Sequence, residues 1–133
     1  MTRPAVVIRF ENEQNAYPPG ATLTGDYWLR GVTLDEVKAV EASVLWYTEG
    51  KGDEDMAVHA FWRTSTDAGD WITPNRPHHF QTMLPRAPLS YNGAILKVRW
   101  CVRVRAFLQG GKEVIGQRGF QLGCIPGVEL VEP

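Results

Sequence analysis

Residues 84–108 read LPRAPLSYNGAILKVRWCVRVRAFL, and their second half carries the most regular strand pattern in the chain. From residue 96 to residue 108, apolar side chains alternate with a row that is mostly basic. Alternation of this length predicts a strand with one face on a core and the other facing water or a partner. We expect the core face to consist of Leu96, Val98, Trp100, Val102, Val104, Ala106 and Leu108.

Six further segments of strand character surround this stretch, and turns rich in glycine and proline separate them. Residues 37–49 are also compatible with a short helix, but their β-branched and aromatic content favours a strand. The pattern predicts an all-β fold, an immunoglobulin-like antiparallel β-sandwich of about seven strands. The expected strands are residues 5–10, 21–30, 37–49, 56–64, 80–84, 96–108 and 113–122.

The length of 133 residues predicts a single domain that spans residues 1–133. A net charge of −1 argues against a nucleic-acid-binding protein, because such proteins usually carry a strong basic excess. We find neither a signal peptide nor a stretch long enough to cross a membrane, so we expect a cytoplasmic protein without membrane insertion. The two cysteines, Cys101 and Cys124, fall at offset strand positions, and we expect both to be reduced.

Two proline-containing motifs resemble those of arrestin-like domains. Residues 17–25 (YPPGATLTG) resemble the motif that opens these domains, and residues 80–93 (FQTMLPRAPLSYNG) resemble the one that precedes a long strand. The resemblance extends over residues 5–123. Arrestin-like proteins include bacterial sporulation-control proteins. The resemblance implies an immunoglobulin-like sandwich that acts as a binding scaffold without catalytic residues. Arrestins pair two such domains, whereas this chain has room for one.

A basic row is the sharpest candidate for a binding site. Arginine binds carboxylates and phosphates through two parallel hydrogen bonds, so such a row fits phosphate, an acidic peptide or an anionic membrane surface. The alternative, which we favour, is pairing across strands with Glu41 and Glu49 of the acidic third strand. The row consists of Lys97, Arg99, Arg103 and Arg105.

Two tryptophans are further candidates for partner contact. Trp28 falls on the polar face of its strand, and Trp71 falls in a loop, whereas Trp46 and Trp100 fall on core faces. Exposed tryptophans often anchor protein interfaces or form platforms on which sugars stack. Trp28 and Trp71 therefore support either a protein-binding module or a carbohydrate-binding one.

No set of residues predicts catalysis, a metal site or a cofactor. The serines lack a GxSxG motif, and no glycine-rich loop precedes a helix. A metal-dependent enzyme would need His78, His79 and Asp70 to converge, but adjacent residues of an extended chain point in opposite directions. We therefore expect solvated loop histidines and no enzymatic activity.

The function that we predict is that of an adaptor or scaffold domain, which binds a protein partner or a second copy of itself. An open sandwich leaves edge strands that need covering. We therefore expect homodimerisation through an edge strand, or strand addition by a partner. The alternative is a β-sandwich module that binds carbohydrate or another ligand, with Trp28 or Trp71 as its platform.

Overall fold

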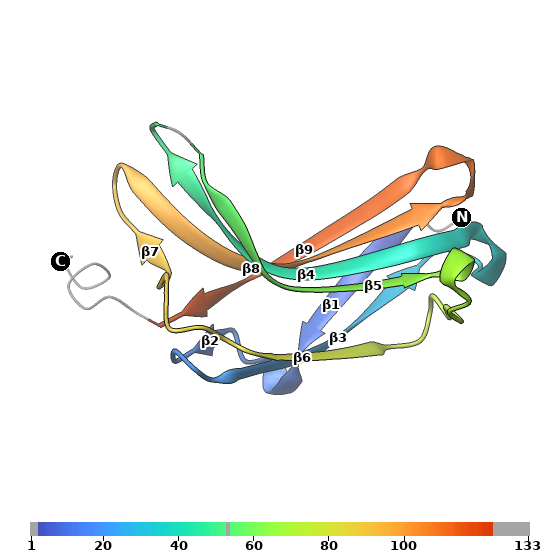
Figure 1. Cartoon of the computed structure of the whole chain (residues 1–133), viewed down its shortest axis with the longest axis horizontal. Helices are drawn as coiled ribbons and strands as arrows, with labels where there is room; N and C mark the ends of the chain where they lie inside the picture. Colours follow the sequence, from blue (N-terminus) through green and yellow to red (C-terminus); the bar gives the residue numbers. More distant parts are fainter. Residues whose placement is uncertain (1–2, 53, 124–133) are drawn as a thin grey trace.

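Two β-sheets pack face to face in the computed structural model, which describes residues 3–52 and 54–123 (Figure 1). The smaller sheet has the order β1-β3-β6, and its strands are β1 (Ala5–Phe10), β3 (Thr22–Arg30) and β6 (His78–Met83). The larger sheet has the order β2-β9-β8-β4-β5, and β7 also pairs with β8. Its strands are β2 (Ala16–Tyr17), β4 (Val37–Gly50), β5 (Met56–Ser65), β7 (Tyr91–Asn92), β8 (Leu96–Leu108) and β9 (Glu113–Leu122). The predicted all-β sandwich is confirmed.

The seven predicted strands are present, and two more were not predicted. β2 and β7 contain two residues each, which is too short for a period-2 pattern to be recognised. β2 also pairs with β9 in parallel, an exception to the expected antiparallel arrangement. The described residues contain no α-helix; their four 3₁₀ turns are η1 (Glu11–Glu13), η2 (Leu34–Glu36), η3 (Thr66–Ala68) and η4 (Gln109–Gly111).

The pairing of β4 with β8 forms the centre of the larger sheet. It runs antiparallel from the Val37–Leu108 pair to the Gly50–Leu96 pair, almost the full length of both strands. This places the third predicted strand beside the sixth, as an immunoglobulin-like order requires. On the face toward the smaller sheet, apolar residues lie opposite one another, for example Val44 opposite Val102. Both of these side chains are fully buried.

Aromatic rings fill one end of the core between the two sheets. Phe120 makes edge-on contacts with Phe10 and Tyr17, at centroid distances of 6.0 and 5.7 Å. Trp100 lies 5.9 Å from Phe120, and its indole N–H donates to the carbonyl oxygen of Pro88 at 2.8 Å. The indole thereby fixes the proline-rich segment that precedes β8, because a buried N–H needs an acceptor.

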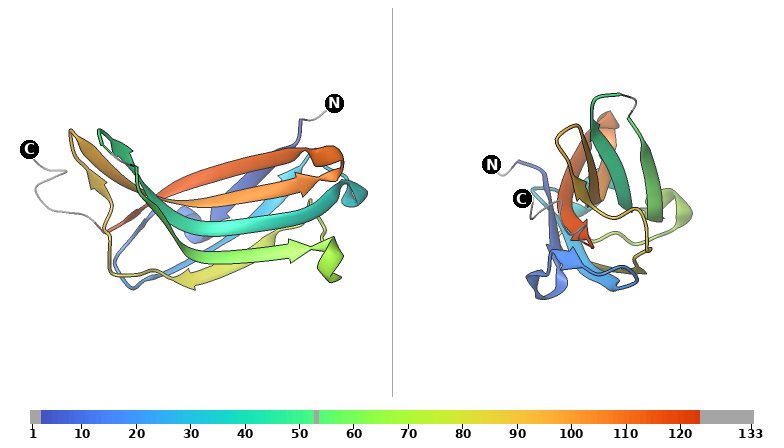
Figure 2. Two further views of the ribbon diagram at one scale, coloured as in Figure 1. Left: turned by 45° about the horizontal axis from the view of Figure 1, so that its top comes forward. Right: turned by 90° about the vertical axis from the view of Figure 1, so that its left-hand side faces the viewer.

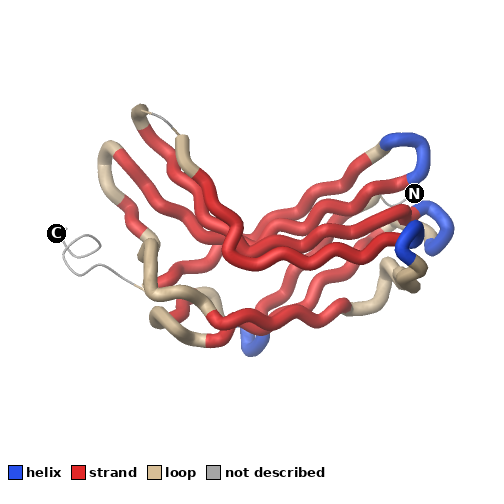
Figure 3. Tube along the Cα trace, viewed as in Figure 1, coloured by secondary structure: helices blue, strands red, loops and turns tan. Residues whose placement is uncertain are grey.

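The predicted core face of β8 is correct from Trp100 to Leu108 and wrong at its beginning. Leu96 is 39% exposed, and Val98 is only half-buried. The beginning of β8 lies in an arm that rises beyond the smaller sheet, together with the tip of the β4–β5 hairpin (Figures 2 and 3). No second sheet covers this arm, so its alternating pattern does not lead to burial.

Two glycines allow close approaches that a larger residue would block. A Cβ atom on Gly25 would lie 2.6 Å from the carbonyl oxygen of Arg9 and 2.7 Å from the ring of Phe80. A Cβ on Gly116 of β9 would lie 2.6 Å from the Cβ of Val6 on β1. Gly116 therefore lets an edge of the larger sheet close onto an edge of the smaller one. A glycine inside a strand often marks a bulge or a close approach of the backbone, and at Gly25 the structure has the close approach.

We expect Gly116→Ala to destabilise the fold, because its methyl group would push β1 away from β9. The free energy of unfolding should fall by about 2 kcal/mol, which lowers Tm by roughly 8 °C in calorimetry. Gly119→Ala is the matched control on the same strand, since its Cβ would meet nothing closer than 3.7 Å. Equal Tm values for the two variants would contradict the close packing of β1 on β9.

Candidate functional site

The larger sheet bends so that its outer face, the one away from the smaller sheet, is concave (Figures 1 and 2). A groove of about 810 Å³ lies on this side, beside β8. It occupies the place where two neighbours of β8 separate: β9 pairs with β8 up to Trp100, and β7 pairs with it from Val98. Arg99 lies between these pairings and has no strand partner on that side. The groove is therefore a split in the sheet.

The wall of the groove is polar and aromatic. Two tyrosines, Tyr47 and Tyr91, line it together with Trp100 and Phe120, whose rings are buried in the core. Its charged residues are Glu49, Lys97 and Arg99, and its carboxamides are Asn15, Asn92, Gln117 and Gln121. Carboxamides both donate and accept hydrogen bonds. The groove can therefore bind a polar chain and also pack against an aromatic ring.

Two members of the basic row form ion pairs across strands, but only one of the pairs has a partner that the sequence predicted. Arg99 of β8 pairs with Glu49 of β4, and Arg105 contacts Glu113 of β9 at 3.5 Å. Glu41 lies opposite Arg105 in the sheet register but pairs with Arg63 of β5 instead. All three pairs are partly exposed, so each contributes no more than about 1 kcal/mol to stability.

The other two members of the row, Lys97 and Arg103, have no carboxylate within ion-pair distance among the described residues. Lys97 lines the groove, with Asn92 and Glu49 as its register partners. Arg103 lies deeper on the concave face, and its Nε donates to Oε1 of Gln117 at 2.9 Å. The basic row therefore divides into two cations in ion pairs and two without a carboxylate partner in the part of the chain that the structure describes.

A hydrogen-bonded bridge crosses the concave face behind the groove. Besides accepting from Arg103, Gln117 of β9 donates from Nε2 to the hydroxyl of Tyr47 of β4, at 3.3 Å. The register places this bridge over Cys101 of β8, which lies between them on the same face. The bridge explains why Cys101 is only 1% exposed although it belongs to the outer row.

Cys101 is a buried free thiol. Burial raises its pKa from 9.0 to about 11, against a smaller opposing effect of the nearby Arg103 guanidinium. The thiol is therefore protonated at neutral pH. The strand pattern gave no sign of this burial, because it placed Cys101 among the basic residues. Cys124, the other cysteine expected to be reduced, lies outside the described residues.

The two candidate tryptophans lie in different environments. Trp28 is half-buried on the outer face of the smaller sheet, with the guanidinium carbon of Arg9 5.1 Å from the ring centroid. Trp71 lies in the connection between η3 and β6 and is 80% exposed. A shallow pocket of about 520 Å³ adjoins Trp28 without being lined by Trp71. The two indoles therefore form no common platform.

The three histidines make separate contacts. His78 stacks on Tyr27 and bonds to the carbonyl oxygen of Thr73 at 2.9 Å, whereas the next residue, His79, contacts Asp26 on the opposite face of β6. Residues 3–52 and 54–123 contain no group of three or more His, Cys, Asp or Glu residues placed to hold a metal ion. The same residues include no helix long and apolar enough to cross a membrane.

Sequence reasoning missed most of the groove. Asn15 and Ser90 come from connections, Tyr91 and Asn92 form the two-residue strand β7, and Gln121 comes from the end of β9. No sequence pattern signals that these residues share a site. They meet only because β7 and β9 separate along β8. The one available signal was the position of Lys97 and Arg99, which lie at the split.

Comparison with known proteins supports the fold. No family model matches the sequence, and a search of curated proteins finds no match. Among solved structures, the chain is similar to Spo0M, a sporulation control protein from Bacillus subtilis, with a TM-score of 0.64 and 18% identity. The alignment covers 99% of this chain and 54% of Spo0M, so the chain spans about half the length of that protein.

A second similar structure is a superoxide reductase (neelaredoxin) from Ignicoccus hospitalis. Its TM-score is 0.52 with 8% identity, over 90% of this chain and 80% of the reductase. At such identities the likeness concerns the fold alone. Both neighbours agree with a β-sandwich, and the likeness to Spo0M is consistent with an immunoglobulin-like, arrestin-like one.

We expect the Cys101 thiol to be almost inert in the native protein. In a Cys124→Ser background, its reaction with a chromogenic disulfide reagent at pH 7.5 should be at least about 100-fold slower than in denaturant. The rise in pKa from 9.0 to about 11 alone lowers the thiolate fraction by that factor. Because the folded state holds the proton more tightly, this thiol lowers native stability as pH rises from about 9 to about 11.

Opening the hydrogen-bonded bridge should expose this thiol. Tyr47→Phe keeps the ring but removes the acceptor for Gln117, so the reaction should accelerate several-fold. Gln121→Ala, on the same strand as Gln117 but outside the bridge, is the control and should leave the rate unchanged. Equal rates in all three proteins would show that the bridge does not protect Cys101.

Proposed function

We propose that this chain is a non-catalytic adaptor domain of the cytoplasm, which binds an acidic segment of a protein partner in the groove beside β8. The observation that carries the proposal is a pair of cations, Lys97 in the groove and Arg103 beside it, that have no carboxylate within ion-pair distance among residues 3–52 and 54–123. Their charge is available to a ligand without first breaking an internal ion pair. A carboxylate that binds them gains charge-assisted hydrogen bonds.

The groove offers further contacts that suit an extended segment rather than a small ligand. Gln121, Asn15 and Asn92 present amide groups that can pair with the N–H and C=O groups of a peptide backbone. Tyr47 and Tyr91 offer ring faces for an aromatic side chain of the same segment. The segment that fits best is therefore acidic and contains at least one aromatic residue.

The rigidity of the concave face supports binding. Arg99 and Arg105 are held by their own ion pairs, and Gln117 is held at both ends of its carboxamide. Side chains that are fixed before binding lose less conformational entropy when a partner arrives. The groove therefore meets a ligand with most of its polar groups already oriented.

Pairing through an edge strand remains a prediction, and β5 is the strand that offers it. β5 ends the larger sheet, and its exposed residues include Met56, Val58 and Phe61. The register with β4 shifts beside His59, so a bulge interrupts the free edge at its middle. Bulges are a common protection against edge-to-edge association. We therefore place the partner in the groove rather than on this edge.

The carbohydrate-binding alternative gains less support. A carbohydrate-binding platform would need an exposed row of indoles. The Arg9 guanidinium lies over the Trp28 ring, and Trp71 does not line the pocket beside Trp28. Only Trp71 has the exposure that a stacking platform needs.

Selection from a displayed library of random 12-residue peptides tests the proposal. The wild-type chain should enrich acidic peptides that contain an aromatic residue. Lys97→Glu combined with Arg103→Glu should weaken binding of the enriched peptides at least about tenfold in calorimetric titration, since each lost charged hydrogen bond costs about 1.5–3 kcal/mol.

Arg105→Glu is the control, because it reverses one charge on the same strand at a cation that already has a partner. It should leave peptide affinity within about twofold of the wild type, with Tm as a check on folding. The proposal fails if no peptide class is enriched, or if the Lys97→Glu, Arg103→Glu protein binds as tightly as the control.

A further inference from the structure

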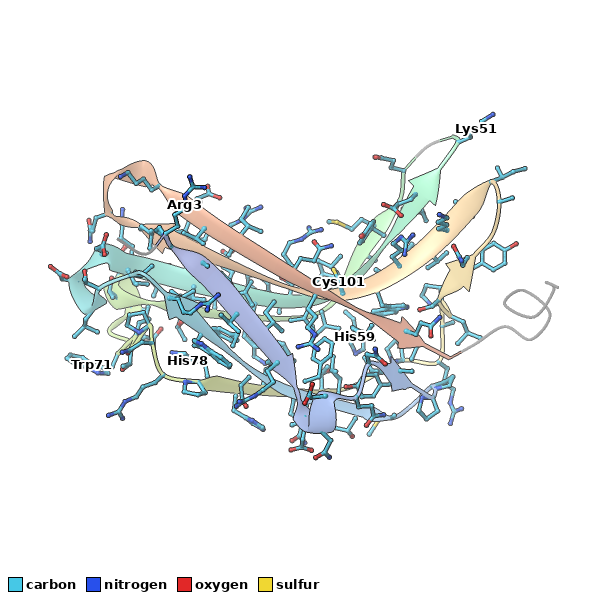
Figure 4. All side chains as sticks on the ribbon, turned by 180° about the vertical axis from the view of Figure 1, so that it is seen from behind. Arg3, Lys51, His59, Trp71, His78 and Cys101 are labelled. Carbon is cyan, nitrogen blue, oxygen red and sulfur yellow. The ribbon has the colours of Figure 1, made fainter. Side chains whose placement is uncertain are left out.

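Trp71 is the most exposed large apolar side chain that the structure describes, at 80%. It projects from the end of the molecule that lies opposite the Lys51 tip of the β4–β5 hairpin (Figure 4). An indole offers a large apolar surface with few rotatable bonds, so tryptophan is the commonest anchor of protein interfaces. An indole left almost entirely in water therefore indicates a docking contact.

The residues on both sides hold Trp71 in place. The preceding residue, Asp70, exchanges two hydrogen bonds with the backbone of Ser65, at 3.1 and 2.8 Å. The following residue, Ile72, is 3% exposed and belongs to the core. Farther along, Pro74 accepts a hydrogen bond from the N–H of Leu29 at 2.7 Å. The chain therefore presents the indole on a fixed turn, which reduces the entropy lost on docking.

The surroundings of the indole are acidic. Asp67 and Asp70 lie on the same connection, and both are exposed. The Trp71 loop (residues 66–73) thus combines an exposed aromatic ring with carboxylates on a rigid turn. This is the kind of segment for which the groove is suited: tyrosine rings and Lys97 line it, and Arg103 adjoins it through its hydrogen bond to Gln117. Neither cation has a carboxylate within ion-pair distance among the described residues.

We propose that the groove of one copy of this chain receives the Trp71 loop of a second copy. The indole packs against Tyr47 and Tyr91, and the carboxylates of the loop face Lys97 and Arg103. This inference rests on the proposed function, because it assigns an occupant to the same groove. It replaces the expected edge-strand dimer by a contact between two different surfaces.

The positions of the two surfaces determine the kind of assembly. The Trp71 loop lies at the end of the sandwich opposite the Lys51 tip (Figure 4). The groove lies toward the arm that carries this tip, since Glu49 and Lys97 line it. Because the two surfaces lie at opposite ends, a row of copies in one orientation satisfies the contact. Each copy then uses its loop on one neighbour and its groove on another, which is a heterologous, head-to-tail arrangement.

Sedimentation velocity on the full chain tests the inference. The wild type should show species larger than a monomer that grow with concentration between about 1 and 200 µM, a range typical of weak contacts. Trp71→Ala should be monomeric throughout, and so should Lys97→Glu combined with Arg103→Glu. Met83→Ala is the matched control, because it removes a different exposed apolar side chain. Met83 is 68% exposed, and its variant should associate as the wild type does.

Mixing the two monomeric proteins gives the sharpest result. Trp71→Ala retains its groove, and the Lys97→Glu, Arg103→Glu protein retains its loop, so together they have one functional contact. The mixture should form one-to-one dimers and nothing larger. Thermal unfolding of each variant shows that its fold is intact, and Trp71→Phe should retain part of the association.

Several results would overturn the inference, and they separate its failure from that of the proposed function. If the wild type stays monomeric but binds acidic peptides, self-docking is refuted and the binding groove stands. If the wild type neither associates nor binds such peptides, both proposals are refuted. Association that survives Trp71→Ala but is lost on Phe61→Lys in β5 points to edge pairing. Quenching of Trp71 fluorescence by oligosaccharides, without association, assigns the indole to a sugar.

Discussion

The antiparallel pairing of β4 with β8 is the constraint on which the rest of the fold depends. It joins two long strands over nearly their whole length, so one face of the pair presents a continuous apolar surface. The smaller sheet packs on this surface, and the aromatic cluster around Phe120 fills one end of the space between them. Among the described residues no further layer covers the opposite face, which contains the groove.

The smaller sheet has two edge strands, β1 and β6. A side chain from the larger sheet forms a hydrogen bond to a backbone carbonyl of each. On one side, Arg118 of β9 donates to the carbonyl oxygen of Ile8 on β1 at 2.9 Å. On the other side, His59 of β5 bonds to the carbonyl oxygen of Met83 at the end of β6, at 2.7 Å. A carbonyl only accepts, so Nε2 of His59 carries the proton. These contacts give both residues a structural role, because each joins the two sheets at one edge.

The length of β4 and β8 also creates the groove. Both strands continue past the smaller sheet into an arm, where β9 leaves β8 and β7 replaces it. The same extension explains why Leu96 is exposed and why Lys97 and Arg99 lie at a split in the sheet. Exposure of an apolar pattern and formation of a polar site thus have one cause, which is that the two sheets differ in length.

The sequence by itself determined the strands, the sandwich and the pairing of the acidic strand with the basic one. These follow from side-chain alternation and from turn residues such as Gly110 and Gly111, which both adopt positive φ as expected. Only the tertiary structure decided which cations stay unpaired, why Cys101 is buried, and that Trp71 is held rigidly in water. Such properties depend on contacts between distant segments, as when Glu41 takes Arg63 as its partner instead of Arg105, and no local pattern records those contacts.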